Sequence, residues 1–297
     1  MQCRGMRIAF RHRTPQNHRM QTIKTFFITS VSSGFGRAIA SAALAAGHQV
    51  VGTVRDAQAA ETFNSQYRGR AHAKLLDVTH FDQVARLASE IEQQIGPVDV
   101  VVNNAGYGYE GILEESPLEA LRRQFDVNVF GAVAVMKAFV PYMRVRRRGH
   151  IINITSMGGY ITMPGISYYC GSKFALEGIS ETLAKELKSF GIAVTAVAPG
   201  SFRTEWAGRS MVRSEREIAE YDALFDPIRQ ARAEKSGKQL GDPDKAAKVI
   251  LQLVEMPEPP QHLLIGSDAL ELVRAKLQAS LANLAQYEEL TRSTDIV

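Results

Sequence analysis

A tyrosine and a lysine stand four positions apart in the chain, as Tyr169 and Lys173. If the segment between them is helical, both side chains lie on one face, so the phenol and the ammonium group stand close together. A nearby ammonium ion favours the phenolate and lowers the pKa of a phenol from its usual value of about 10. The pair therefore predicts a general base for an alcohol and, in reverse, a general acid for a ketone. Tyr168 cannot form this pair, because the fourth residue after it is Ser172.

This spacing is common by chance, so its meaning depends on other polar residues. Ser156 follows the apolar segment HIINIT and precedes Tyr169 by 13 residues, and its hydroxyl could polarise a substrate carbonyl. Asn128 stands in the sequence FDVNVFG, inside a segment with a helical pattern, although asparagine is only a moderate helix former. We therefore expect Ser156 to contact the substrate beside Tyr169.

The sequence TSVSSGFG, residues 29–36, follows an apolar segment and precedes an alanine-rich one. A strand, a loop of small residues and a helix N-terminus together suit the phosphate of a nucleotide. Ser30 stands where such loops commonly have a glycine. It could adopt a positive φ, at a cost on the order of 1 kcal/mol or more, or a negative φ with its hydroxyl toward the ribose or the 2′-phosphate. The loop residues expected to bind the nucleotide are Ser30, Ser32, Ser33, Gly34, Phe35 and Gly36.

The end of the second expected strand bears on the choice between NAD and NADP. An NAD site has a carboxylate about 20 residues after the loop, whereas an NADP site has an arginine near the 2′-phosphate. Arg55 and Asp56 lie 19 and 20 residues after Gly36. Arg55 directly follows the strand and can bind a phosphate bidentately, whereas Asp56 is placed to cap a helix that begins at Ala57. We therefore predict NADP, with NAD as the less favoured alternative.

The segments that must position these residues alternate between strand and helix patterns. Strands are expected at 24–29, 48–54, 75–78, 98–102, 150–155, 192–198 and 262–265, and helices at 36–46, 80–95, 118–145 and 167–190. Almost continuously apolar strands separated by helices predict a parallel sheet covered on both faces, which binds its ligand at the carboxyl ends of the strands. The expected fold is α/β, a single-domain Rossmann fold with a doubly wound parallel sheet, over residues 20–297.

Composition and charge restrict the class of protein. The chain is 45% hydrophobic and 22% charged, which is ordinary for a soluble enzyme, and we find no apolar run near the ~18–20 residues of a membrane span. Residues 1–19 hold five arginines and no acidic residue, so the remainder is nearly neutral and no nucleic-acid partner is expected. We expect this leader to be disordered. It is an over-long gene start, with Met20 as the initiator, or alternatively a transit peptide.

The cysteines and histidines point to neither a disulfide framework nor a metal site. The chain has only two cysteines, Cys3 and Cys170, which are far apart and fit a cytoplasmic location. His48, His80 and His150 stand singly, without a second ligand at metal spacing, so each is expected to be structural.

Taken together, these motifs and their order resemble the short-chain dehydrogenase/reductase family over residues 22–265. The resemblance implies a catalytic tetrad of Asn128, Ser156, Tyr169 and Lys173. In it Tyr169 is the acid and base, Lys173 also holds the nicotinamide ribose, Ser156 orients the substrate and Asn128 anchors a water in the proton path. The resemblance further implies that the cofactor is bound by Asp77, Asn104, Ala105, Gly106, Pro199, Gly200, Phe202 and Thr204.

The substrate class follows from a finer resemblance. The sequences NNAGYGYEGILEE, from residue 103, and VRD, from residue 54, resemble the branch that includes 17-beta-hydroxysteroid and retinol dehydrogenases and many bacterial oxidoreductases. This implies hydride transfer between NADP(H) and a lipophilic secondary alcohol, ketone or aldehyde. The alternative is a non-catalytic NADP-sensing Rossmann protein. A sensor has no need of the tetrad, so the presence of all four residues favours the enzyme.

Two segments near the C-terminus have further expected roles. Residues 201–241 are charged and follow a Pro-Gly turn, which predicts a lid over the substrate. Residues 267–290 are expected to form a helix whose apolar stripe could close the pocket, form a subunit interface of a homodimer or homotetramer, or dock on its own domain. The stripe consists of Leu270, Val273, Leu277, Leu281 and Leu284.

Overall fold

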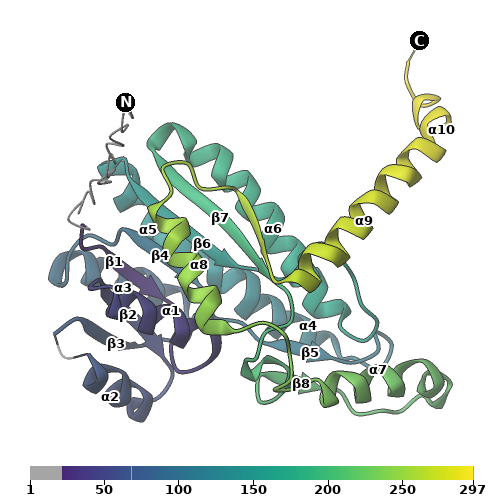
Figure 1. Cartoon of the computed structure of the whole chain (residues 1–297), viewed down its shortest axis with the longest axis horizontal. Helices are drawn as coiled ribbons and strands as arrows, with labels where there is room; N and C mark the ends of the chain where they lie inside the picture. Colours follow the sequence, from purple (N-terminus) through teal and green to yellow (C-terminus); the bar gives the residue numbers. More distant parts are fainter. Residues whose placement is uncertain (1–21, 68, 297) are drawn as a thin grey trace, which may run out of the picture.

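The computed structural model describes residues 22–67 and 69–296, and the prediction made for residues 1–19 lies outside them. A parallel sheet of seven strands, in the order β3-β2-β1-β4-β6-β7-β9, forms the centre of the molecule (Figure 1). Its strands are β1 (Thr25–Ile28), β2 (Gln49–Val54), β3 (Ala71–Leu75), β4 (Val100–Asn103), β6 (Gly149–Ile154), β7 (Ile192–Pro199) and β9 (His262–Ile265). The chain reverses its direction of winding between β1 and β4, which is where such a sheet binds its ligand.

Helices cover both faces of this sheet, which confirms the predicted doubly wound α/β fold (Figure 1). One core cluster joins the sheet to α1 and α8, and a second joins its other face to α3, α5 and α6. The helices are α1 (Gly34–Ala45), α2 (Ala57–Gln66), α3 (Phe81–Gln94), α4 (Leu118–Phe125), α5 (Ala132–Arg146), α6 (Ser167–Leu187), α7 (Asp222–Glu234), α8 (Pro243–Glu255), α9 (Ser267–Gln286) and α10 (Glu288–Arg292).

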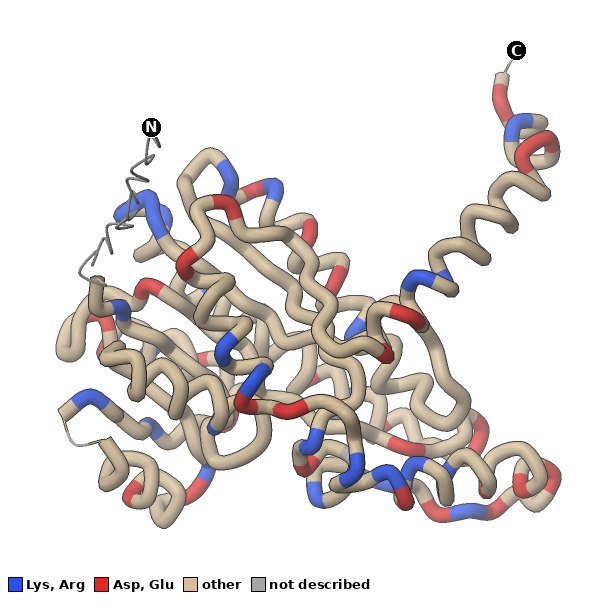
Figure 2. Tube along the Cα trace, viewed as in Figure 1, with Lys and Arg blue, Asp and Glu red and all other residues tan. Residues whose placement is uncertain are grey.

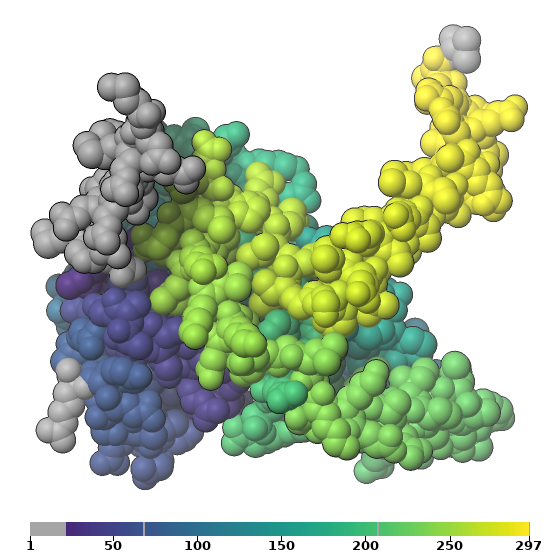
Figure 3. Space-filling model, in the orientation of Figure 1, coloured from purple at the N-terminus to yellow at the C-terminus, as the bar shows by residue number. Residues whose placement is uncertain are grey.

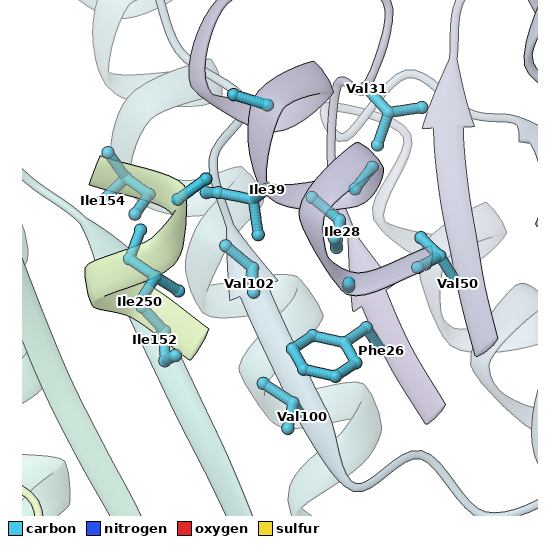
Figure 4. Packing of buried hydrophobic residues seen from close by; sticks show 14 of the residues in the cluster. Phe26, Ile28, Val31, Ile39, Val50, Val100, Val102, Ile152, Ile154 and Ile250 are labelled. Atoms are coloured by element: carbon cyan, nitrogen blue, oxygen red, sulfur yellow. The ribbon is translucent and has the colours of Figure 1, made fainter. Parts of the chain in front are cut away.

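Strand β1 has the sequence TFFI, and its last three positions are apolar because both faces of the strand are buried. Phe26 and Ile28 point into the cluster beneath α1 and α8, where Figure 4 shows Ile28 beside Ile39 and Phe26 beside Val100. Phe27 points to the opposite face and packs in the other cluster. Successive side chains of a strand alternate between faces, so a strand buried on both faces has apolar residues at successive positions.

The third strand was placed too late in the sequence. It was expected at 75–78, but β3 spans Ala71–Leu75 and lies at the edge of the sheet. An edge strand is partly exposed, so most of β3 is only half-buried and its sequence, AHAKL, has no continuous apolar run. The apolar residues Leu76 and Val78 that suggested a strand follow it in a loop and pack against the second core cluster.

A long helical stretch, Leu118–Arg146, runs through α4, a π-helical segment at Asp126–Gly131 and α5. Among the described residues, this stretch is the only helix long and apolar enough to span a membrane, with a mean hydropathy of 1.2. No such apolar run was expected from the sequence. Val135, Phe139 and Met143 of α5 are buried against the sheet, so this face of the stretch belongs to the core.

Candidate active site

Tyr169 and Lys173 lie one turn apart on α6 and both line a cavity of about 750 Å³ at the carboxyl ends of the strands. Lys173 Nζ is 5.7 Å from the centre of the Tyr169 ring and donates a hydrogen bond of 2.9 Å to the main-chain oxygen of Ile154. Burial lowers the pKa of Lys173 to about 8, and the carboxylate of Glu177 acts in the opposite direction. The helical spacing therefore brings the phenol and the ammonium group together, as the sequence predicted.

The phenol itself corrects one prediction. The pKa of Tyr169 is raised, not lowered, and burial is the largest cause, while a hydrogen bond with Ser156 opposes it. Its ring is buried against Ile166 and Cys170 and lies 5.0 Å from the ring of Trp206, and burial disfavours the charged phenolate. A neutral phenol with a buried ammonium group beside it is suited to donating a proton to a ketone oxygen.

Asn128 lies in the π-helical segment between α4 and α5, not in an ordinary helix. Its amide nitrogen donates to the main-chain oxygen of Tyr107 and to Ser172 Oγ, both at 3.1 Å, and its amide oxygen accepts from the main-chain nitrogen of Tyr107. A Cβ added to Gly106 would lie 3.1 Å from this oxygen and 3.8 Å from Lys173 Nζ. Asn128 thus ties the loop after β4 to α6 near Lys173, while its role in a proton path stays a prediction.

Behind Lys173 stands a buried carboxylate, Glu177, one further turn along α6. It accepts hydrogen bonds from the hydroxyl groups of Thr155 and, at 3.0 Å, Tyr160. His262 Nδ1 lies 2.8 Å from both the Glu177 carboxylate and the Tyr160 hydroxyl. Thr155 lies between Ile154, whose main-chain oxygen binds Lys173, and Ser156, which contacts Tyr169. By binding Thr155, Glu177 therefore holds the strand end that supplies both of these contacts.

The loop after β1 shows which of the two expected backbone conformations Ser30 adopts. Ser30 has a φ of 60°, so the alternative with a negative φ is wrong. Hydrogen bonds hold this conformation from both sides, since the main-chain nitrogen of Ser30 donates to Thr53 Oγ1 at 3.1 Å and its oxygen accepts from Asn104 Nδ2 at 3.1 Å. A Cβ at Gly36 would lie 2.1 Å from that same oxygen, so this position admits only glycine.

The same loop presents its atoms to the cavity. Ser30, Ser33, Gly34 and Phe35 line it, and the Ser33 side chain makes no hydrogen bond at the α1 N-terminus that it precedes. Ser32 is exposed and Gly36 is buried beneath the loop, so neither lines the cavity. A helix N-terminus and a small, open loop at the switch point of the sheet fit the pyrophosphate of a dinucleotide.

The residues expected at the adenosine end lie outside the cavity. Asp56 caps α2 by accepting from the main-chain nitrogen of Ala59 at 2.8 Å, as predicted, which leaves Arg55 exposed at the end of β2. The carboxylate of Asp77 accepts hydrogen bonds from Thr79 at 2.7 and 2.9 Å. Burial of the carboxylate raises the pKa of Asp77. These hydrogen bonds and the charges of His80 and Arg55 lower it, and the pKa is lowered overall.

The remaining cofactor candidates follow β4 and β7. Ala105 does not line the cavity, and its main-chain nitrogen donates to Thr29 Oγ1 at 2.8 Å. The others all contribute to the cavity wall: Asn104, Gly106, Pro199, Gly200, Phe202 and Thr204. The structure therefore gathers most of the predicted cofactor and catalytic residues around one cavity. Those that lie outside its wall are Ser32, Gly36, Arg55, Asp77, Ala105 and Asn128.

Several cavity residues were not predicted. The residues at 201–241 contribute the largest new group, which includes Trp206 and the α7 residue Ile228. Trp206, the single tryptophan of the chain, stands two positions after Thr204, and its rarity was the one available signal. The other apolar wall residues that sequence reasoning missed are Met157, Met163, Ile166, Leu240 and Leu272.

A buried carboxylate anchors α7 beside this cavity. Glu110 belongs to β5 (Gly108–Glu110), which pairs with β8 (Met211–Arg213) in a small sheet that was not predicted. Its carboxylate forms ion pairs with Arg213 at 3.2 Å, with Arg229 at 3.4 Å and with Arg232. Arg229 and Arg232 come from α7, so residues 201–241 are tied to the body by charge; their action as a lid stays a prediction.

The chain was also compared with known proteins. The sequence profile described as short chain dehydrogenase matches residues 24–214. A 3-ketodihydrosphingosine reductase from Bacteroides thetaiotaomicron is 36% identical over 263 residues, or 88% of this chain and 94% of that protein. The structure of a short-chain dehydrogenase from Streptomyces avermitilis matches with a TM-score of 0.86 at 39% identity, over 93% of this chain and 100% of that one.

A further solved structure, ElxO with NADP bound, matches with a TM-score of 0.71 at 27% identity, over 84% of this chain and 100% of that one. The profile covers more than half of the chain, and the Bacteroides relative is matched over nearly its whole length. The chain therefore belongs to the short-chain dehydrogenase family of oxidoreductases.

Proposed function

We propose that the protein is an NADPH-dependent reductase of a ketone carried on an apolar molecule, and that it runs the reverse oxidation when the cofactor ratio favours it. The observation that carries the proposal is the buried pair of Tyr169 and Lys173 at a cavity whose other end is the loop after β1. The neutral phenol can give its proton to the carbonyl oxygen in the reduction, and the phenolate can take a proton back in the oxidation.

The choice of NADP has two supports. ElxO, a structural relative, has NADP bound in its structure. In this chain the side chain that directly follows β2 is the exposed Arg55, while Asp56 is engaged as the α2 cap. An arginine at this place suits a 2′-phosphate, and a carboxylate already used as a cap is a poor partner for a ribose hydroxyl.

The proposed substrate class follows from the cavity wall. Side chains of Met163, Ile166, Trp206 and Leu272 line it, so the greater part of a bound molecule would meet apolar groups. The Bacteroides relative is named as the reductase of a 3-keto compound, which supports a ketone as the reacting group.

The residues divide the chemical work among them. NADPH, when bound, supplies the hydride that the carbonyl carbon receives. Ser156 orients the carbonyl oxygen by a hydrogen bond, and Tyr169 donates its phenolic proton to that oxygen, which completes the alcohol. The ammonium group of Lys173 stabilises the phenolate that remains, and the apolar wall keeps water from the reacting atoms.

A panel of ketones, aldehydes and the matching alcohols tests this proposal. Each is incubated with NADPH or NADH in parallel, and the absorbance of the reduced cofactor is followed. We expect turnover of bulky apolar ketones with NADPH and much weaker turnover with NADH. The non-catalytic NADP-sensing alternative would be favoured if the protein bound NADPH but turned over no panel member, and if Tyr169→Phe behaved as the wild type in both measurements.

A further inference from the structure

Helix α9 leaves the body of the protein after its first two turns. Ala269 and Val273 are buried, and Leu272 lines the cavity, so this part is held by the domain. Beyond it the helix stands off from the rest of the molecule, as Figures 1 and 3 show. The side chains of Leu277, Leu281 and Leu284 are 53%, 67% and 66% exposed. The expectation that this stripe docks on its own domain is therefore wrong from Leu277 onward.

The projecting part is unlike a helix built for water. Between Lys276 and Glu288 the sequence LQASLANLAQY has no charged residue, and Figure 2 shows this uncharged stretch of α9. A helix exposed on all sides normally carries charged residues around it, often in stabilising pairs, and isolated helices of about 12–15 residues are marginal in water. The leucine stripe therefore needs a partner surface to cover it.

We propose that a second copy of this chain covers the stripe, with the two α9 helices packed antiparallel about a two-fold axis near Leu281. In a two-fold interface each residue pair occurs twice, so one self-complementary stripe is sufficient. With Leu281 at the axis, Leu277 of each copy lies opposite Leu284 and Ala285 of the other. Alanines and a serine separate the leucines along the helix, which allows the two backbones to approach closely.

The charges at the two ends of the stripe select the antiparallel arrangement. Arg274 and Lys276 stand before it, and Glu288 and Glu289 stand after it. Glu288 is paired with Arg292 of its own chain at 2.8 Å, so Glu289 is the acidic residue left for a partner. An axis near Leu281 brings the basic end of each helix beside the acidic end of the other, whereas a parallel pair would bring like charges together.

A membrane surface fits the stripe less well than a second copy does. Helices that lie in a membrane interface carry lysines and arginines on their polar face. Here the polar positions between Lys276 and Glu288 are Gln278, Ser280, Asn283 and Gln286, and the segment that follows begins with two acidic residues. These groups offer no attraction to anionic lipid headgroups.

The oligomeric state of the full chain in solution tests the proposal. Sedimentation velocity over a range of protein concentrations should show a species of twice the chain mass of 32.7 kDa. Because a single helix pair is a small interface, we expect a concentration-dependent dimer. Leu281→Asp places two carboxylates at the axis and should shift the dimer midpoint to at least tenfold higher concentration, with reductase activity retained because Leu281 is remote from the cavity. Gln286→Asp, exposed on the same helix and turned away from the stripe, is the matched control.

Two further measurements fix the orientation and the partner. Lys276→Glu and Glu289→Lys should each weaken the dimer, and the double variant should restore it. Leu281→Cys, in a chain with Cys3→Ser, should form a crosslinked dimer under mild oxidation, whereas Gln286→Cys should not. Three results would each overturn the proposal. The chain could be a monomer at all concentrations, or its dimer could be unchanged by Leu281→Asp. The wild-type chain could also bind anionic vesicles, with Leu281→Asp abolishing that binding.

Discussion

At the scale of single residues, the site depends on two ionisable groups that are held out of water for different reasons. Burial raises the pKa of the Tyr169 phenol and lowers the pKa of Lys173, and the carboxylate of Glu177 behind Lys173 opposes the second effect. One face of α6 thus carries an acid, a cation and an anion at successive turns. The anion contacts no reacting atom, so Glu177 acts as a positioning residue.

Replacing Glu177 with Gln tests this role through the pH profile. The groups that face Glu177 are Lys173, Tyr160, His262 and Thr155, so loss of its charge acts mainly on the one buried cation. The pKa of Lys173 should fall below its value of about 8. Ketone reduction requires the ammonium form, so kcat/KM should begin to fall at lower pH than in the wild type. Activity should drop several-fold near pH 9 and change little near pH 6.

Glu186→Gln is the matched control, because Glu186 is exposed on the same helix. It removes an equal charge and should leave the pH profile in place. A Glu177→Gln variant with the wild-type profile would show that the carboxylate has no influence on Lys173.

The cofactor preference is also decided by one residue. Arg55→Ala removes the cation that is expected to meet the 2′-phosphate, so kcat/KM with NADPH should fall by about 10-fold to 100-fold, in line with a charge-assisted hydrogen bond of about 1.5–3 kcal/mol. The value with NADH should change little. Initial rates with the two cofactors measure the ratio, and an unchanged ratio would contradict the assignment of Arg55.

At the scale of elements, the loop after β1 stores backbone strain at the place where the nucleotide should bind. Ser30 is held at a positive φ by Thr53 on one side and Asn104 on the other, so three strands of the sheet impose this conformation. Gly36 completes the loop, since its position has no room for a side chain. The strain belongs to the site that it shapes.

Ser30→Gly should therefore stabilise the protein by about 0.5–1 kcal/mol, because glycine adopts a positive φ without steric cost. Chemical denaturation of the wild type and the variant measures the difference. Ser32→Gly is the control, since Ser32 is in the same loop without a positive φ, and it should give no stabilisation. Equal or lower stability of Ser30→Gly would show that the positive φ is not strained.

The sequence predicted the features that depend on the spacing of residues close together in the chain. The period of α6 paired Tyr169 with Lys173, and apolar runs located the central strands. What it could not predict depends on tertiary burial. Partial exposure hid the edge strand β3, and the burial that raises the pKa of Tyr169 comes from the packing of α6 within the folded chain.

At the scale of the whole molecule, the sheet gathers one reaction site at its carboxyl edge, and the C-terminal region serves two purposes. The first turns of α9 complete the cavity through Leu272, and the projecting turns carry the uncovered stripe (Figure 3). Pairing of two copies would therefore hold the start of α9, and with it one wall of the cavity.

The most direct test of the central claim is the rate of NADPH-dependent ketone reduction by Tyr169→Phe, measured beside NADPH affinity. The variant should bind NADPH as the wild type does and lose about 10²–10⁴-fold in kcat/KM, because the proton donor is gone and the ring remains. Tyr168→Phe is the control, since its hydroxyl donates at 2.8 Å to the main-chain oxygen of Ser116 and not into the cavity. Full turnover by Tyr169→Phe would contradict the account.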